Sequence, residues 1–276
     1  MIGWLIYSAV DVEKNKYYIQ MYKDKFKEHF IEIKLVIVEE LENMEQYVKC
    51  NKVDFAINRS RNHIMGELLE QKGVRVFNSS SVTRIANNKG ITYEFLKDVV
   101  PFLAVKYGNE IIESKIENKG FEYPYVIKSC SGHGGSQVFL VNNSKEEEQA
   151  IKAMNGQEYV VQQCCSDLGR DVRVYIIGNK IIKAVLRTST ESFKSNYSLG
   201  GKVQEYTLNN EEKAMVERIV DKLPLDYAGI DFTFHNGKAV FNEIEDAVGA
   251  RMLYQVSDID IVEMYIKHIL EQLSKE

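Results

Sequence analysis

The sequence has 276 residues, of which 45% are hydrophobic and 27% charged, so it can form one large domain or two to three small ones. Its 40 acidic residues outnumber its 35 basic residues, and the resulting net charge of -5 disfavours sequence-independent binding of nucleic acid. No stretch approaches the roughly 20 apolar residues that span a bilayer, and the short apolar run at the N-terminus has no basic leader, so we expect a cytoplasmic protein without a membrane partner.

The first part of the chain alternates strand and helix patterns, which favours a small domain built on an open parallel sheet. We place this α/β domain at residues 1–80. The loop at residues 78–82 then leads to a helix at residues 89–96. Within the domain, strands are predicted at residues 2–9, 33–38, 53–57 and 74–77, and helices at residues 11–30 and 61–72.

Two further parts follow, each with mixed α and β character. In residues 81–158, the β-rich runs YPYVIKS and SQVFLV flank the segment CSGHGGS, and a helix follows at residues 145–154. Residues 159–276 form the third part, whose predicted strands are residues 159–163, 172–177, 180–186, 227–234 and 238–245, with helices at residues 210–222 and 258–273. The sequence has only three prolines and no low-complexity linker, so the three parts should pack closely. The four cysteines lack the spacing of a zinc site, and we expect buried free thiols.

The glycine-rich segment KSCSGHGGSQV is the first candidate for chemistry. Glycines let backbone N–H groups approach phosphate oxygens, and a strand lysine, Lys128, adds a positive charge. Because the segment joins two strands and opens no helix, it differs from a Walker loop and from the dinucleotide-binding fingerprint. A flap over phosphates and a plain glycine hairpin are both compatible with the pattern.

Cations and hydrogen-bonding groups gather farther along the chain. The strand end YVVQQCC can present backbone donors and acceptors to an adenine edge. Arg173 shares a strand face with Asp171 by the two-residue period, and Arg187 precedes a segment that holds Lys194 and Asn196. Such cations suit the recognition of phosphate or carboxylate. A solvated strand edge is the alternative for Arg173.

Acids inside apolar strands are the strongest signal. Asp231 lies in GIDFTF, and Glu243 and Glu245 share one face of VFNEIE. Acids in such strands are costly unless they are paired, protonated or metal-bound. Clustered carboxylates suit magnesium on nucleotide phosphates, and a structural acid–base network is the alternative.

The metal hypothesis makes a geometric demand. A strict two-residue turn at Asn236 and Gly237 would place Asp231 opposite Asn242 and leave Glu243 on the other face. A shared metal requires Asp231 opposite Glu243. The sequence therefore predicts an odd-numbered loop or a β-bulge in this hairpin.

These segments, in this order, resemble the ATP-grasp superfamily, most closely its RimK-like branch, from residue 78 to the C-terminus. The resemblance rests on PYVIKSCSGHGGSQV, GRDVRVYIIGNKII, FKSNYSLGG and GIDFTFHNGKAVFNEIE. It implies an α/β and α+β fold in which a small Rossmann-like domain is followed along the chain by two α+β subdomains that clasp ATP. It also implies magnesium, with manganese as an alternative ion, and an acylphosphate that an amine attacks. The site residues it implies are, for ATP, Lys89, Lys128, Ser131, Gly132, Gly134, Gly135, Gln162, Gln163, Cys164, Cys165 and Asp167; for catalysis, Arg173, Arg187 and Asn196; and for metal, Asp231, Glu243 and Glu245.

Three positions depart from the family pattern. Glu245 stands where the family usually has Asn; a third carboxylate there either binds magnesium or repels the triphosphate. Gln137 replaces the last glycine of the flap, and the segment DAVGARMLY lacks the usual small-residue and proline pattern. Arg251 in that segment is a candidate for binding an acceptor carboxylate.

An ATP-dependent carboxylate–amine ligase is therefore the leading functional prediction. Its expected substrates are small-molecule, amino-acid or peptide carboxylates and amines, and a homodimer is the default assembly. An ATP-dependent small-molecule kinase and a catalytically weak ATP-binding module are the alternatives. A ligase needs an amine and releases ADP and phosphate, a kinase stops at the phosphorylated product, and a binding module shows no turnover.

Overall fold

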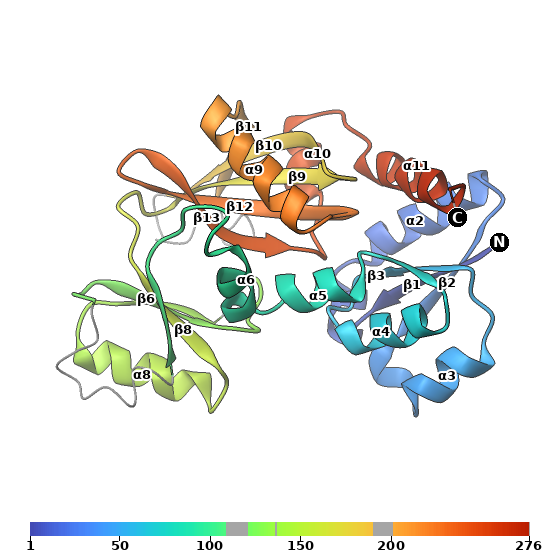
Figure 1. The fold of residues 1–276 in the computed structure, drawn as a ribbon, viewed down its shortest axis with the longest axis horizontal. Helices are drawn as coiled ribbons and strands as arrows, with labels where there is room; N and C mark the ends of the chain where they lie inside the picture. Colours follow the sequence, from blue (N-terminus) through green and yellow to red (C-terminus); the bar gives the residue numbers. More distant parts are fainter. Residues whose placement is uncertain (109–120, 136, 190–200, 276) are drawn as a thin grey trace.

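The computed structural model describes residues 1–108, 121–135, 137–189 and 201–275, arranged as three sheets with helices packed on them (Figure 1). Among these residues, no helix is long and apolar enough to cross a membrane. All four cysteines are free thiols. Cys130 is buried as expected, but Cys50 is exposed and Cys164 and Cys165 are half-buried, so the expectation of burial is wrong for these three.

The N-terminal domain is the expected parallel sheet. Its strands are β1 (Ile2–Tyr7), β2 (Glu32–Ile37), β3 (Phe55–Asn58) and β4 (Arg75–Phe77), in the order β2-β1-β3-β4. The connections are α1 (Ala9–Val12), α2 (Lys16–Glu28), the 3-10 turn η1 (Val38–Glu40), α3 (Met44–Cys50) and α4 (His63–Gln71). The single helix predicted at residues 11–30 is two helices in the structure: α1 ends at Val12, and α2 begins at Lys16. The short helix α3, which the sequence analysis missed, begins with an Asn43 side-chain cap.

The C-terminal subdomain is built on a five-stranded antiparallel sheet in the order β11-β10-β9-β12-β13. Its strands are β9 (Arg170–Ile177), β10 (Lys180–Thr188), β11 (Lys202–Tyr206), β12 (Tyr227–His235) and β13 (Lys238–Glu245). One face packs on α9 (Asn210–Lys222), α5 (Ser80–Ala86) and α6 (Lys89–Leu96). The opposite face shares a core with the N-terminal domain and with α10 (Arg251–Val256) and α11 (Ile261–Leu273).

The central subdomain has a four-stranded sheet in the order β5-β8-β6-β7, covered by α8 (Ser144–Met154). Its strands are β5 (Val105–Tyr107), β6 (Tyr125–Ser129), β7 (Val138–Val141) and β8 (Tyr159–Gln163). We expected β8 to open the third part, but it pairs with β5 and β6 in this central sheet. Strand periodicity cannot reveal which sheet a strand joins, because pairing partners are distant in sequence.

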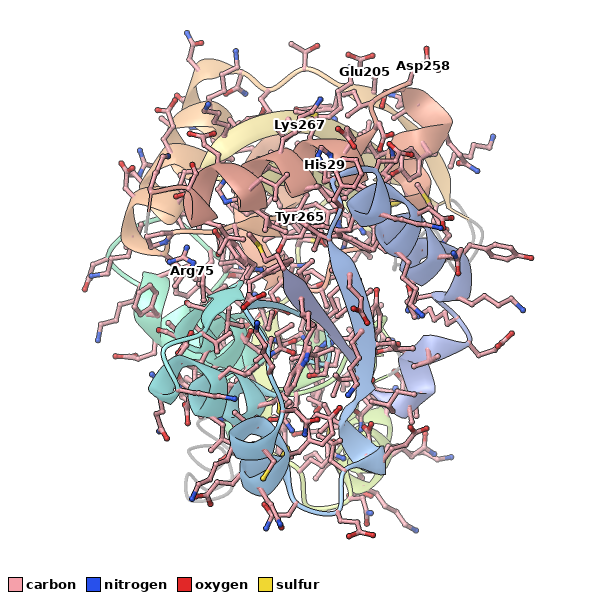
Figure 2. The ribbon with its side chains drawn as sticks, turned by 90° about the vertical axis from the view of Figure 1, so that its right-hand side faces the viewer. His29, Arg75, Glu205, Asp258, Tyr265 and Lys267 are labelled. Atoms are coloured by element: carbon pink, nitrogen blue, oxygen red, sulfur yellow. The ribbon has the colours of Figure 1, made fainter. Side chains whose placement is uncertain are left out.

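The N-terminal and C-terminal parts are joined through buried contacts. The side chain of Asn78 donates to the carbonyl of Tyr227 at 2.7 Å and accepts from the amide of Asp226 at 2.7 Å. Arg59, which is buried, donates to the carbonyls of Ala247 and Val248. Tyr265 of α11 lies in the same core, with its ring 4.9 Å from that of Tyr227 (Figure 2). These contacts fix the N-terminal sheet against one face of the five-stranded sheet.

Candidate functional site

Charged residues form a row across the middle of the five-stranded sheet. Arg173 on β9 lies opposite Asp231 on β12, which lies opposite Glu243 on β13. On the other side of β9, Asp171 lies opposite Arg187 of β10. Opposed residues in a sheet share a face. Asp171 and Arg173 therefore share a face, as expected. The whole row lies on the face of the sheet that packs against the N-terminal domain.

Of the two predicted departures from a simple hairpin, an odd-numbered loop or a β-bulge, the structure has the bulge. Asn236 and Gly237 form a two-residue turn in which both residues have positive φ, as a type I′ turn requires. The register then shifts between Asp231 and Phe232, so that Asp231 pairs with Glu243 while Phe232 pairs with Phe241. The expected opposition of Asp231 and Glu243 is confirmed, and Asn242 is the extra residue.

Asp231 is fully buried, and both of its carboxylate oxygens are occupied by arginines. Arg173 donates to both oxygens at 2.8 Å, and Arg187 donates to Oδ2 at 2.7 Å. Arg187 also contacts Asp171, and Arg173 forms an ion pair with Glu245 at 2.5 Å. Burial alone would raise the pKa of Asp231, but the charges of the two arginines outweigh it and hold this pKa below its usual range.

The three acids therefore do not gather around one point. Among the residues that the structure describes, no group of three His, Cys, Asp or Glu side chains is placed to hold a metal ion. Asp231 becomes available to a cation only if Arg173 or Arg187 leaves it. The role of these acids as metal ligands stays a prediction, and the acid–base network that was its alternative is present.

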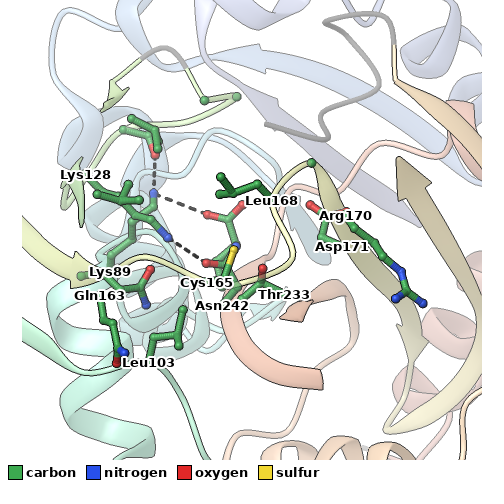
Figure 3. Close-up of a pocket in the computed structure, with 18 residues that line it drawn as sticks. Lys89, Leu103, Lys128, Gln163, Cys165, Leu168, Arg170, Asp171, Thr233 and Asn242 are labelled. Carbon is green, nitrogen blue, oxygen red and sulfur yellow. Dashed lines mark hydrogen bonds and ion pairs between the residues drawn. The ribbon is translucent and has the colours of Figure 1, made fainter. Parts of the chain in front are cut away.

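Two lysines face this row from the other subdomains. Lys89, at the start of α6, donates to the carbonyl of Gly132 at 2.6 Å and lies 3.6 Å from Glu243. Lys128 of β6 donates to the side chain of the bulged Asn242 at 2.8 Å (Figure 3). Burial lowers the pKa of Lys128 to about 8, against the opposing effect of the Glu243 charge.

A cleft between the central and C-terminal subdomains collects most of the residues predicted to bind nucleotide (Figure 3). Ser131, Cys164 and Asp167 are not among its lining residues, while Asn196 lies outside the described residues. The predicted residues that line the cleft are Lys89, Lys128, Gly132, Gly134, Gly135, Gln162, Gln163, Cys165 and Glu243.

Several lining and supporting residues escaped sequence analysis. Leu103, Val126 and Leu168 give the cleft apolar surface, but an apolar residue near a strand carries no local sign of a site. Tyr93 donates to the carbonyl of Asn242 and accepts from the side chain of Gln162, so it ties β13 to the end of β8. For Asn242, the predicted bulge was a usable signal, because a bulged residue is released from the strand pairing.

A second cavity, which we call the acceptor cavity, adjoins the cleft. It lies between the N-terminal domain and the C-terminal subdomain and is lined by Arg173, Arg187 and Glu245, which do not line the cleft. Glu243 and Gly134 line both spaces. The two cavities therefore meet at Glu243, beside the predicted glycine flap.

The chain matches the model of the RimK-like ATP-grasp domain over residues 94–269. It is 32% identical over 269 residues to the uncharacterized protein MG011 of Mycoplasma genitalium, covering 96% of this chain and 91% of that protein. It is also 24% identical over 206 residues to a probable alpha-L-glutamate ligase of Haemophilus ducreyi, covering 72% of this chain and 67% of that protein.

Solved structures show the same architecture. The D-alanine–D-alanine ligase of Bacillus anthracis complexed with ATP superposes with a TM-score of 0.78 at 16% identity, and the match covers 100% of this chain and 98% of that one. At this identity the likeness establishes the fold alone. The expected ATP-grasp fold behind a parallel-sheet domain is confirmed. Because the family model spans residues 94–269 and a relative above 30% identity covers nearly the whole chain, the protein belongs to the RimK-like ATP-grasp family.

Proposed function

We propose that the protein is an ATP-dependent carboxylate–amine ligase. One observation carries the proposal: a cleft with two lysines meets a cavity with two arginines, and Glu243 lines both spaces. ATP in the cleft would direct its terminal phosphate toward a carboxylate in the acceptor cavity. The names of the relatives, a probable alpha-L-glutamate ligase and a D-alanine–D-alanine ligase, support this reaction class.

The residues of the cleft divide into two groups. The apolar side chains of Leu103, Val126 and Leu168 suit a base, beside the strand end that carries Gln162 and Gln163. At the other end, Lys89 and Lys128 suit the phosphates, since each ammonium group already bonds to an oxygen acceptor there. The glycine flap adds backbone N–H groups that can approach phosphate oxygens.

The reaction would proceed in two steps. A carboxylate oxygen of the acceptor attacks the terminal phosphorus of ATP, the bond to the bridging oxygen breaks, and ADP leaves. The nitrogen of an amine then attacks the acylphosphate carbon, phosphate leaves, and the amine loses a proton. Arg173 and Arg187 lie on the acceptor side, where they stabilise the negative charge of the transferring group.

A divalent cation fits Glu243 better than the other two acids. Glu243 is partly exposed and has only Lys89 as an ion-pair partner in the described part of the chain, at 3.6 Å. Asp231 is fully occupied by arginines, and Glu245 is paired with Arg173. Magnesium or manganese bound at Glu243 would supply charge neutralisation for the ATP phosphates.

Product analysis tests this function. The protein is incubated with ATP, Mg²⁺ and pools of carboxylates and amines, and ADP, phosphate and coupled product are quantified. A ligase releases ADP and phosphate in equal amounts only when an amine is present. A phosphorylated product that forms without an amine would instead identify a kinase, and ATP binding with no turnover would identify a binding module.

The pH dependence of ATP binding gives a separate prediction for Lys128. Because burial lowers its pKa to about 8, the ammonium group is charged at neutral pH and loses its proton above about pH 8. We expect the affinity for ATP to be constant from pH 7 to about 8 and then to fall by up to about tenfold per pH unit. Calorimetric titration measures it. Lys128→Gln should bind ATP more weakly and lose this dependence; an unchanged profile in that variant would contradict the assignment.

A further inference from the structure

Two adjacent cysteines lie at the connection between the central and C-terminal subdomains. Cys164 and Cys165 directly follow β8 of the central sheet, before the chain enters β9 of the five-stranded sheet. Both are half-buried free thiols, and the proposed reaction uses neither side chain. Of the two, Cys165 lines the cleft and Cys164 does not. A thiol that lines a binding cleft without a part in the reaction is a candidate for chemistry of its own.

Hydrogen bonds to the β12–β13 hairpin hold the segment that carries these cysteines. The amide of Ser166 donates to Nδ1 of His235 at 3.2 Å, and its hydroxyl accepts from the amide of Asn236 at 2.7 Å. Because the residue that follows Cys165 is tied to the hairpin in this way, the sulfur of Cys165 is held in the cleft beside Thr233 of β12 (Figure 3).

The surroundings of Cys165 favour its thiolate. The Cys164 thiol donates a hydrogen bond to the Cys165 sulfur, and the Thr233 hydroxyl donates another. The positive charge of Lys128 acts in the same direction. Together these effects outweigh burial and lower the pKa of Cys165 to about 6. A partly exposed cysteine beside a positive charge is the setting in which thiols react, because the thiolate is the nucleophile.

We propose that Cys165 is a thiol–disulfide exchange site, at which the protein takes up one half of a small-molecule disulfide and thereby closes the cleft to ATP. The sulfur of Cys165 attacks one sulfur of the disulfide, a new S–S bond forms, and the old S–S bond breaks with release of one thiolate. The Cys165 sulfur is oxidised and the departing sulfur is reduced, so no further reactant is needed. The attached group then lies in the cleft, in the space that ATP would use.

Cys164 supports the thiolate and does not close a ring with Cys165. The Cα atoms of adjacent residues are about 3.8 Å apart across a trans peptide bond, whereas those of disulfide-bonded residues usually lie at least about 4.4 Å apart. A disulfide between these neighbours would therefore be strained. The stable product is the mixed disulfide at Cys165, and a reducing thiol reverses it by the same exchange.

Chemical modification tests the site directly, with other cysteines of the chain as internal controls. The protein is treated at pH 6 with 2-hydroxyethyl disulfide, and mass spectrometry of its peptides follows each thiol. At this pH about half of Cys165 is thiolate, against under about 1% of an ordinary thiol, and the lower nucleophilicity of a low-pKa thiolate offsets about tenfold of this advantage. We expect Cys165 to react at least about fivefold faster than the exposed Cys50, and the buried Cys130 to remain unmodified.

Competition with ATP tests the consequence for the cleft, which rests on the proposed function. ATP with Mg²⁺, at a concentration well above its dissociation constant, should slow the modification of Cys165 at least about fivefold and leave that of Cys50 unchanged. Conversely, calorimetric titration should show that the modified protein binds ATP at least about 20-fold more weakly. Dithiothreitol should restore the binding, because it reduces the mixed disulfide.

Three variants assign these effects to single thiols. Cys165→Ser nearly keeps the size of the side chain and removes the exchange chemistry, so its ATP affinity should be the same before and after treatment. Cys50→Ser is the matched control at an exposed thiol and should lose only the modification outside the cleft. Cys164→Ala removes the hydrogen-bond donor and should slow the reaction of Cys165 at least about twofold at pH 6.

Three results would overturn the inference. They are a reaction of Cys165 no faster than that of Cys50, a disulfide between Cys164 and Cys165 in place of the mixed disulfide, and unchanged ATP binding by the fully modified protein. Failure of the proposed function is distinguishable, because it appears as absent ATP binding before any treatment, while the peptide masses still report on the reaction of Cys165.

Discussion

Replacing Asp231 by asparagine is expected to lower the free energy of unfolding by about 3–5 kcal/mol, the cost typical of breaking a buried ion pair from one side. The asparagine keeps the shape of the side chain but removes the charge that Arg173 and Arg187 share. Both arginines are buried, so they would face each other without their common counter-charge. Urea-induced unfolding monitored by circular dichroism measures the difference.

A surface ion pair provides the control for this experiment. Lys183 of β10 and Glu205 of β11 form a diagonal ion pair between neighbouring strands, and the side chain of Glu205 is 58% exposed. Glu205→Gln should therefore cost less than about 1 kcal/mol. A loss below this value for Asp231→Asn would show that the buried network contributes little to stability.

The same network predicts how stability responds to acid. The two arginines hold the pKa of Asp231 below the 3.8 that applies to the unfolded chain, with burial acting against them. A carboxylate with a depressed folded-state pKa stabilises the fold fully above the unfolded pKa. We therefore expect its contribution to be complete above about pH 4 and to disappear as the pH falls through the folded-state pKa. Asp231→Asn should lack this component of acid denaturation.

The second large effect is expected at Glu243. We expect Glu243→Gln to reduce kcat/KM for the ATP-dependent reaction by at least about 100-fold, because it removes the carboxylate shared by the two cavities and the best-placed cation ligand. ADP release measured over a range of Mg²⁺ and Mn²⁺ concentrations tests this. Since Glu243 is partly exposed, the free energy of unfolding of the Glu243→Gln variant should differ from that of the wild-type protein by no more than about 0.5 kcal/mol.

Glu245→Gln separates two interpretations of the same strand. Glu245 contacts Arg173 and lines only the acceptor cavity, so we expect a loss of less than about tenfold and an unchanged dependence on cation concentration. If Glu245→Gln instead requires much more Mg²⁺ and recovers when it is supplied, Glu245 is the third metal ligand that the sequence suggested.

Glu245 stands at the position where the resemblance to the ATP-grasp superfamily implies asparagine. In this chain the position carries a carboxylate, and its charge is countered by Arg173, which also serves Asp231. The negative charge of Glu245 is therefore balanced by Arg173, and the side chain lines the acceptor cavity. It need not repel the ATP triphosphate, because Glu245 does not line the cleft.

Much of the fold was readable from the sequence, because strand and helix periods are local. The helices α6 and α9 were predicted with the bounds that the structure shows. The register of Asp231 opposite Glu243 was predicted as well, through an odd-numbered loop or a bulge, because a metal shared by the two acids required them on one face. The short elements α3, α5, β5, β11 and α10 were missed, because their length gives little periodic signal. The expected loop at residues 78–82 is wrong from residue 80 onward, where α5 begins.

The order of the residues alone predicts acids and arginines within apolar strands, a glycine segment between two strands, and a resemblance to one family. Which charges meet depends on how the strands are arranged in the folded chain. Strand order β10-β9-β12-β13 is not chain order, and it places Arg173 and Arg187 on Asp231, where the sequence suggested a metal. The same long-range packing brings Lys14 and Arg251 to one cavity. A local pattern specifies the face on which a side chain lies, but its neighbours depend on contacts between segments far apart in the chain.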